Sequence, residues 1–123
     1  MTYPPEILTW LAETEAKRGI RILFAAESGS RSWRLESADS DYDVRFVYTH
    51  PLERYLDIHT PTEQIDAPIH NALDFVGWDL RKFMVHLGKC NPSVHNWLFT
   101  PIVYQQVPGV LPQLQALAHQ YFN

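Results

Sequence analysis

The chain has 123 residues, of which 46% are hydrophobic and 20% charged, a composition that is typical of a globular protein and excludes global disorder. At roughly 100–200 residues per domain, this length predicts one domain that covers residues 1–123. The formal net charge of −4 excludes a large basic surface, so any contact with nucleic acid has to be local.

The N-terminus has neither a basic segment nor a long apolar stretch, and the single cysteine, Cys90, cannot form an intrachain disulfide. The longest apolar runs, such as residues 22–26, are far shorter than the roughly 20 residues that a membrane-spanning helix needs. We therefore expect a cytoplasmic protein without a membrane-spanning segment.

The spacing of apolar residues predicts the elements in chain order. Helices are expected over residues 4–18, from about residue 31, from residue 77 to Gly88 or Asn91, and over residues 93–99 and 111–122, and a helical turn or a short strand is expected near residues 53–56. Strands are expected over residues 20–26, 42–49 and 69–76, with a short extended piece at residues 102–104. Alternation in the second strand predicts one face with Val44, Phe46 and Tyr48 and another with Asp43, Arg45 and Val47. We expect an α/β (α+β) domain with a small mixed, mostly antiparallel sheet and helices mainly on one face.

Two sequence features suggest a site for a phosphate and a metal ion. Asp41 and Asp43 lie two apart in a strand and so point to the same face, and two such carboxylates are costly without a cation between them. Mg²⁺ typically binds one or two carboxylates together with substrate phosphates. Gly29-Ser30, a turn between a strand and an expected helix, presents backbone N–H groups to an anion. Each feature alone is common in ordinary turns and strand starts; their combination is far more specific.

Other interpretations of these residues fail at particular positions. In an EF-hand starting at Asp39, Val44 would stand where the loop needs glycine and His50 where it needs glutamate. A haloacid dehalogenase-type phosphatase has an apolar strand before its first aspartate, whereas residues 37–40 form a polar segment. The histidines show none of the spacings that are typical of zinc sites.

Several segments resemble the DNA polymerase β-like nucleotidyltransferase superfamily, and in particular the branch that includes RNA-repair-associated polymerases. The segments are Glu27-Ser-Gly-Ser-Arg-Ser-Trp33, Asp39-Ser-Asp-Tyr-Asp-Val-Arg-Phe46, Gly77-Trp-Asp-Leu-Arg-Lys82 and Asn91-Pro92. The resemblance extends over residues 24–104 and implies a nucleotidyltransferase fold like the palm of polymerase β. It also implies that Gly29 and Ser30 bind the β- and γ-phosphates and that Asp41 and Asp43 hold the metal ions.

In this superfamily a third carboxylate comes from a neighbouring strand, and Asp74 is the first candidate for it. Asp79 is the second candidate, although its place at the start of an expected helix favours an N-cap. Arg31 and Lys82 are candidate phosphate ligands, with a solvated helix face as the other interpretation of Lys82. Arg45 is a phosphate ligand or, equally, an ion-pair partner of Asp43.

The resemblance implies a metal-dependent enzyme that transfers a nucleoside monophosphate from an NTP or dNTP to a hydroxyl acceptor, with an RNA end among the candidates. Its cofactor would be Mg²⁺ or Mn²⁺, and its catalytic residues Asp41, Asp43 and Asp74. The alternative is a non-catalytic or truncated module that binds a nucleotide or a protein partner. Two differences from the family favour it: Arg34 stands where family members usually have glycine, and family members continue into a helical C-terminal part. Apolar surface left uncovered without that part would favour a homo-oligomer.

Overall fold

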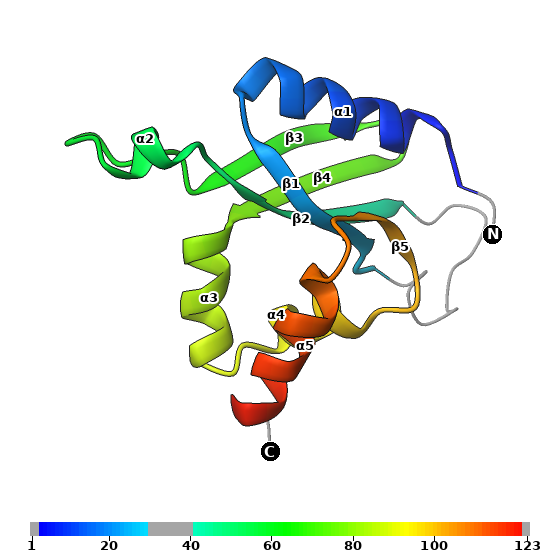
Figure 1. Ribbon diagram of the computed structural model, residues 1–123. Helices are drawn as coiled ribbons and strands as arrows, with labels where there is room; N and C mark the ends of the chain where they lie inside the picture. Colours follow the sequence, from blue (N-terminus) through cyan, green and yellow to red (C-terminus); the bar gives the residue numbers. More distant parts are fainter. Residues whose placement is uncertain (1–2, 30–40, 122–123) are drawn as a thin grey trace.

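The computed structural model describes residues 3–29 and 41–121 and has the expected mixture of helices and strands (Figure 1). The helices within these residues are α1 (Glu6–Arg18), α2 (Leu52–Tyr55), α3 (Leu80–Gly88), α4 (Pro92–Phe99) and α5 (Val110–Tyr121). The strands are β1 (Arg21–Glu27), β2 (Tyr42–Thr49), β3 (Gln64–His70), β4 (Leu73–Asp79) and β5 (Val103–Gln106). They form a five-stranded sheet in the order β3-β4-β2-β1-β5. Of the pairings among the described strands, β2·β4 is parallel and the others are antiparallel, so the predicted fold class is confirmed.

The sheet separates two apolar cores, and its central strand β2 contributes to both. Val44, Phe46 and Tyr48 face the core under α1, whereas Val47 faces the core that is covered by α3, α4 and α5. Figure 1 shows the same division, with α1 on one side of the sheet and these three helices on the other. The alternation predicted for residues 42–49 is therefore confirmed. It places Asp43 and Arg45 on the side of the three helices, because residues two apart in a strand share a face.

The strand predicted over residues 69–76 is wrong, because a hairpin turn falls inside this range. Strand β3 ends at His70 and β4 begins at Leu73. The residues between them, Asn71 and Ala72, have φ angles of 53° and 62°, the positive values that a two-residue type I′ turn requires at both positions. A turn without glycine gives a weak signal in the sequence.

The helix predicted to open at residue 77 begins three positions later, because Gly77 to Asp79 complete β4. The side chain of Asp79 accepts a hydrogen bond from the backbone N–H of Arg81 at 2.7 Å. Asp79 is thus the N-cap of α3, as its position suggested, and it also accepts a hydrogen bond from the Tyr55 hydroxyl at 2.6 Å.

Gly77 provides a test of packing in the middle of the sheet. It lies opposite Phe46 in the parallel pair, and a Cβ built on it would overlap the Phe46 ring. We expect Gly77→Ala to lower the free energy of unfolding by about 1–3 kcal/mol, as overpacked cores do. Gly88→Ala is the control, since a Cβ there meets nothing within 4 Å, and it should be neutral or slightly stabilising. Urea denaturation of both variants checks this, and equal stabilities would contradict it.

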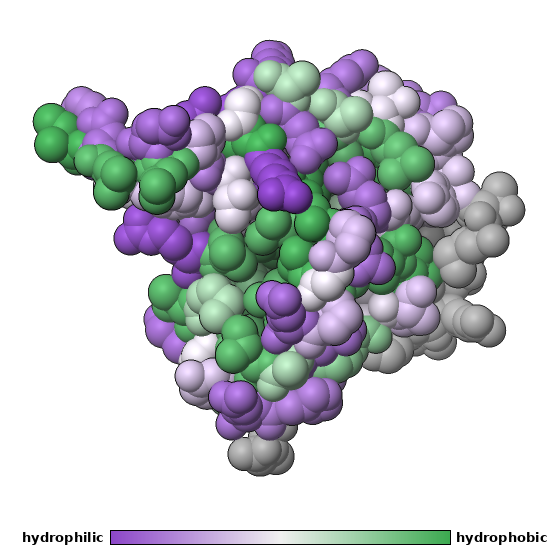
Figure 2. Space-filling model, viewed as in Figure 1, coloured by the Kyte–Doolittle hydropathy of each residue, from purple (hydrophilic) through white to green (hydrophobic). Residues whose placement is uncertain are grey.

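A segment around α2 projects from the rest of the molecule (Figure 1) and carries apolar surface on the face shown in Figure 2. The side chains of Leu52, Leu56 and Ile58 are 69%, 76% and 93% exposed. Self-association of the chain stays a prediction. No helix within residues 3–29 and 41–121 combines the length and the apolar character needed to cross a bilayer.

Candidate functional site

The structure brings Asp43 and Asp74 together on neighbouring strands. They are partners in the parallel register of β2 and β4, and their side chains are 30% and 23% exposed. Nη2 of Arg45 lies 3.1 Å from Oδ2 of Asp74 and 3.9 Å from Oδ1 of Asp43. Arg45 therefore forms the ion pair that was one of its two predicted roles, with Asp74 as the closer partner.

The surroundings of Asp43 disfavour the charged form of its carboxyl group. Burial raises the pKa of Asp43 above its ordinary value, and the Arg45 guanidinium opposes this effect only in part. The charges of Asp74 and of Asp41, which directly precedes β2, raise it further. A cation that entered the site would relieve this repulsion.

Gly29 lies directly against the carboxylate of Asp43. A Cβ built on Gly29 would overlap Oδ2 of Asp43, so a larger residue here has to displace that side chain. The adjacent backbone N–H of Ser28 donates to the carbonyl oxygen of Asp43 at 2.9 Å. The predicted phosphate turn and the predicted metal ligand are thus neighbours. Ser30 and Arg31, the other residues predicted at this turn, lie outside the described residues.

Glu27, at the end of β1, fixes this arrangement, a role that the sequence motifs do not indicate. Its side chain is fully buried, and its Oε2 accepts hydrogen bonds from the backbone N–H groups of Gly29 at 3.2 Å and Asp43 at 2.9 Å. Its Oε1 accepts one from the Tyr104 hydroxyl at 2.6 Å. Burial raises the pKa of Glu27, and these three hydrogen bonds counteract the shift in part. The signal in the sequence is a charged residue at the end of an otherwise apolar run.

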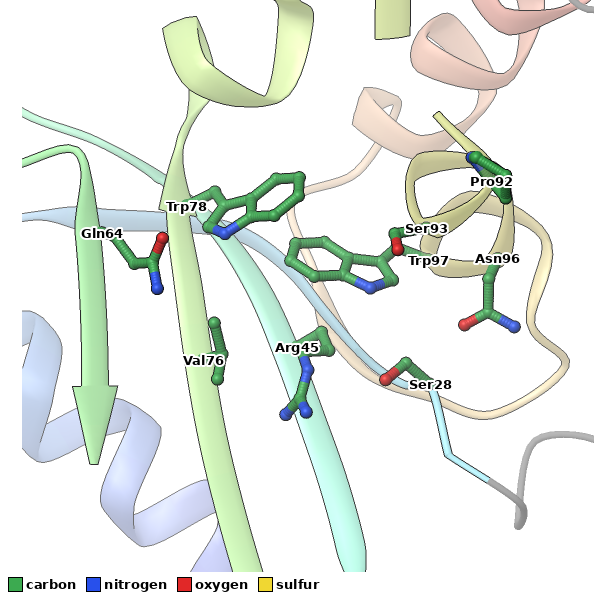
Figure 3. Close-up of a pocket in the computed structure, with 9 residues that line it drawn as sticks. All are labelled: Ser28, Arg45, Gln64, Val76, Trp78, Pro92, Ser93, Asn96 and Trp97. Carbon is green, nitrogen blue, oxygen red and sulfur yellow. The ribbon is translucent and has the colours of Figure 1, made fainter. Parts of the chain in front are cut away.

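Beside the carboxylates lies an open cavity of about 570 Å³ (Figure 3). Strands β2 and β4 supply Arg45 and Val76 to its lining, and α4 supplies Asn96 and Trp97. Ser28, next to the glycine of the turn, also lines it. The cavity therefore adjoins the two aspartates through Arg45, which lines it and forms an ion pair with Asp74.

Lys82, a predicted phosphate ligand on α3, contacts the edge of this cavity. Its Nζ donates a hydrogen bond to Oε1 of Gln64 at 2.6 Å and lies 5.3 Å from the centre of the Trp78 ring. Gln64 and Trp78 both line the cavity. Lys82 thus contacts two residues that line the cavity, and its role as a phosphate ligand stays a prediction.

The donor atoms suit a hard divalent cation that arrives with its own ligands. Within the part of the chain that the structure describes, no three histidine, cysteine, aspartate or glutamate side chains form a group that could hold a metal ion. Asp43 and Asp74 provide two adjacent carboxylates, and Mg²⁺ usually binds proteins through one or two carboxylates and completes its shell with water and substrate phosphates. Mn²⁺ has the same preference for oxygen ligands.

Comparison with known proteins gives a family and one relative. A family model described as "RNA repair pathway DNA polymerase beta family" matches residues 4–123. "Uncharacterized protein YcgL" of Bacillus subtilis (strain 168) is 41% identical over 117 residues, which are 95% of this chain and 45% of the relative. The chain thus spans less than half the length of that curated relative.

Proposed function

Because the chain belongs to the RNA repair pathway DNA polymerase beta family, we propose that it transfers a nucleoside monophosphate from an NTP or dNTP to a hydroxyl acceptor. The observation that carries the proposal is the register of the parallel pair, which sets Asp43 beside Asp74 while Gly29 lies against the Asp43 carboxylate. An RNA end is the acceptor that the family description favours.

In this reaction the acceptor oxygen attacks the α-phosphorus of the nucleotide and forms the new P–O bond. The bond from the α-phosphorus to the bridging oxygen breaks, and pyrophosphate leaves with that electron pair. Asp74 takes the proton of the acceptor hydroxyl, and its ion pair with Arg45 at 3.1 Å holds the carboxylate in place. The absence of a side chain at Gly29 leaves room for the Asp43 carboxylate at the turn where the β- and γ-phosphates are expected to bind.

Asp43 and Asp74, the two carboxylates that the parallel register sets side by side, would hold Mg²⁺ or Mn²⁺, an ion that when bound neutralises phosphate charge and favours ionisation of the acceptor hydroxyl. Asp41 directly precedes β2, and within residues 3–29 and 41–121 it forms no three-residue metal-binding group with Asp43 and Asp74, so its role as a third ligand stays a prediction. Arg45, at 3.1 Å from Asp74 and 3.9 Å from Asp43, offsets part of the charge of these two carboxylates.

Transfer of radiolabel tests the proposal. The chain is incubated with α-labelled NTPs and dNTPs, with Mg²⁺ or Mn²⁺, and with RNA that ends in a free 3′-hydroxyl. We expect labelled RNA with the wild type and none with the Asp41→Asn, Asp43→Asn double variant. Absence of label on RNA, on the protein itself and on components of a cell extract would contradict the proposal.

A module that binds a nucleotide without transferring it is the second candidate function. The observation that favours it is that no three histidine, cysteine, aspartate or glutamate side chains within residues 3–29 and 41–121 form a group that could hold a metal ion. Nucleotide binding that depends on Asp43, together with no transfer to any acceptor, is the result that this second function predicts.

A further inference from the structure

Trp97 carries a hydrogen-bond donor at the wall of the cavity beside the two aspartates. The side chain lies on α4 and is 5% exposed. Figure 3 shows its indole nitrogen on the side of the ring that faces Arg45, Ser28 and Asn96. No residue in the described ranges 3–29 and 41–121 accepts a hydrogen bond from this N–H group.

A buried indole N–H usually has an acceptor, because a donor removed from water without one destabilises the structure. The ring of Trp97 is held rigidly by aromatic contacts with Trp78, at 4.5 Å between ring centres, and with Phe83, at 6.0 Å. These contacts fix the direction of the N–H group. A ligand in the cavity with an acceptor atom opposite Trp97 would complete the hydrogen bond.

The cavity adjoins the place where the phosphates of a nucleotide are expected. Arg45 lines the cavity and also binds Asp74. Ser28 lines it as well and directly precedes Gly29, the glycine of the phosphate turn. A nucleotide whose phosphates lie at this turn and at the carboxylates therefore has the cavity within reach of its sugar and base.

The lining fits a flat heterocycle better than a phosphate. Val76 and the rings of Trp78 and Trp97 provide apolar surface. The amides of Gln64 and Asn96 lie at opposite ends of the labelled side chains in Figure 3. The volume of about 570 Å³ falls in the range of roughly 300–1,000 Å³ that is usual for small-molecule sites. A phosphate would instead seek several cationic groups or N–H donors.

We propose that this cavity binds the base of the donor nucleotide and that the Trp97 N–H donates a hydrogen bond to a ring nitrogen or carbonyl oxygen of that base. The inference rests on the proposed function, since it takes the nucleotide to be the substrate. It assigns to Trp97 and the cavity beside Arg45 the recognition of the base, and to Gly29 and the aspartates the recognition of the phosphates.

The indole N–H resonances of the ¹⁵N-labelled chain provide the direct test. The chain has four tryptophans, and Trp97→Phe identifies the resonance of Trp97 by its disappearance. On addition of each of ATP, GTP, CTP and UTP with Mg²⁺, we expect at least one nucleotide to shift the Trp97 proton downfield, as a new hydrogen bond does. Inorganic tripolyphosphate with Mg²⁺, which has no base, should leave this resonance in place.

Affinity measurements by calorimetry provide the second test. Trp97→Phe keeps an aromatic ring and removes the N–H, so we expect the preferred nucleotide to bind about five- to tenfold more weakly, the effect of one hydrogen bond. Tripolyphosphate should bind both proteins equally. Trp10→Phe is the matched control, because Trp10 packs against Phe75 in the core on the opposite face of the sheet, with 4.0 Å between the ring centres. It should change neither the affinity for the nucleotide nor that for tripolyphosphate.

The outcomes separate this inference from the proposed function. Nucleotide binding that needs Asp41 and Asp43, with an unmoved Trp97 resonance and full affinity in Trp97→Phe, would overturn the base site and leave the proposed function standing. No binding of any NTP or of tripolyphosphate with either Mg²⁺ or Mn²⁺ would overturn both.

Discussion

Replacement of Asp41 and Asp43 together by asparagine is expected to abolish binding of the Mg²⁺–nucleotide complex while the chain stays folded. Asparagine keeps the shape of each side chain and removes both negative charges from the end of β2. Mutation of a residue that only hydrogen-bonds to a metal ligand typically lowers metal affinity 10–100-fold, so loss of two ligands should lower the affinity by at least about 100-fold. Isothermal titration calorimetry with Mg²⁺ and each NTP measures this loss.

The stability of the double variant separates a lost site from a lost fold. Burial and the neighbouring charges of Asp74 and Asp41 raise the pKa of Asp43, which means that the charged form of Asp43 is disfavoured in the protein. Its neutral replacement should therefore leave the stability equal to or above that of the wild type at neutral pH. Asp57→Asn changes an exposed aspartate in the segment after α2 and is the control. Unchanged nucleotide affinity in the double variant would rule out the site.

Substitution of Glu27 by leucine is expected to destabilise the chain by about 3–5 kcal/mol, the usual cost of removing one side of a buried charged interaction. Leucine fills a similar volume but takes the acceptor away from Gly29, Asp43 and Tyr104 together. Glu27→Gln is the matched variant, since its carbonyl oxygen can still accept from the two backbone N–H groups. Tyr104→Phe removes one hydrogen bond and should cost about 1 kcal/mol. Urea denaturation compares the three variants, and leucine and glutamine variants of equal stability would contradict the assigned role.

The stability of the wild type relative to Glu27→Gln should also depend on pH. Burial raises the pKa of Glu27 above 4.5, so the folded chain holds this proton more tightly than the unfolded chain does. The resulting stabilisation is fully present below pH 4.5 and is lost as the pH rises through the raised pKa. Glutamine does not titrate, and the wild type should therefore lose stability relative to the variant over that interval. A difference that stays constant with pH would contradict this assignment.

The sequence predicts best those parts of the fold in which the burial of side chains follows the regular period of the strand or helix. The alternation in β2 is an example, because each of Val44, Phe46 and Tyr48 is buried on the side that the period of two assigns. Most of strand β3 is not predicted, and the reason is physical. It is an edge strand, so polar residues and a proline are tolerated in it, and the alternation of apolar and polar residues is weaker. The limits of β4 are missed because Gly77 to Asp79 resemble the opening of a helix, whereas their burial alternates within the sheet.

The candidate site likewise has parts that the sequence predicts and parts that it does not. The resemblance to the nucleotidyltransferase superfamily predicts that Gly29 and Asp43 act at one site and that a neighbouring strand contributes Asp74. The contact between Glu27 and Tyr104 joins residues that are 77 positions apart, so no local pattern contains it. The cavity around Trp97 likewise arises only when α4 packs over the sheet.

The parallel pairing of β2 and β4 has a consequence for the order of folding. This pairing aligns Asp43 with Asp74, and the two strands are separated in the chain by the α2 segment and β3. Their pairing therefore requires closure of a long loop. The hairpin of β3 and β4, by contrast, closes through the two-residue turn at Asn71 and Ala72. Contacts of high sequence separation form slowly. The mutual repulsion of the two carboxylates therefore arises only after the surrounding sheet has assembled. A nucleotide and its cation would bind the completed sheet and not a partly folded chain, which makes their binding a specific measure of the native state.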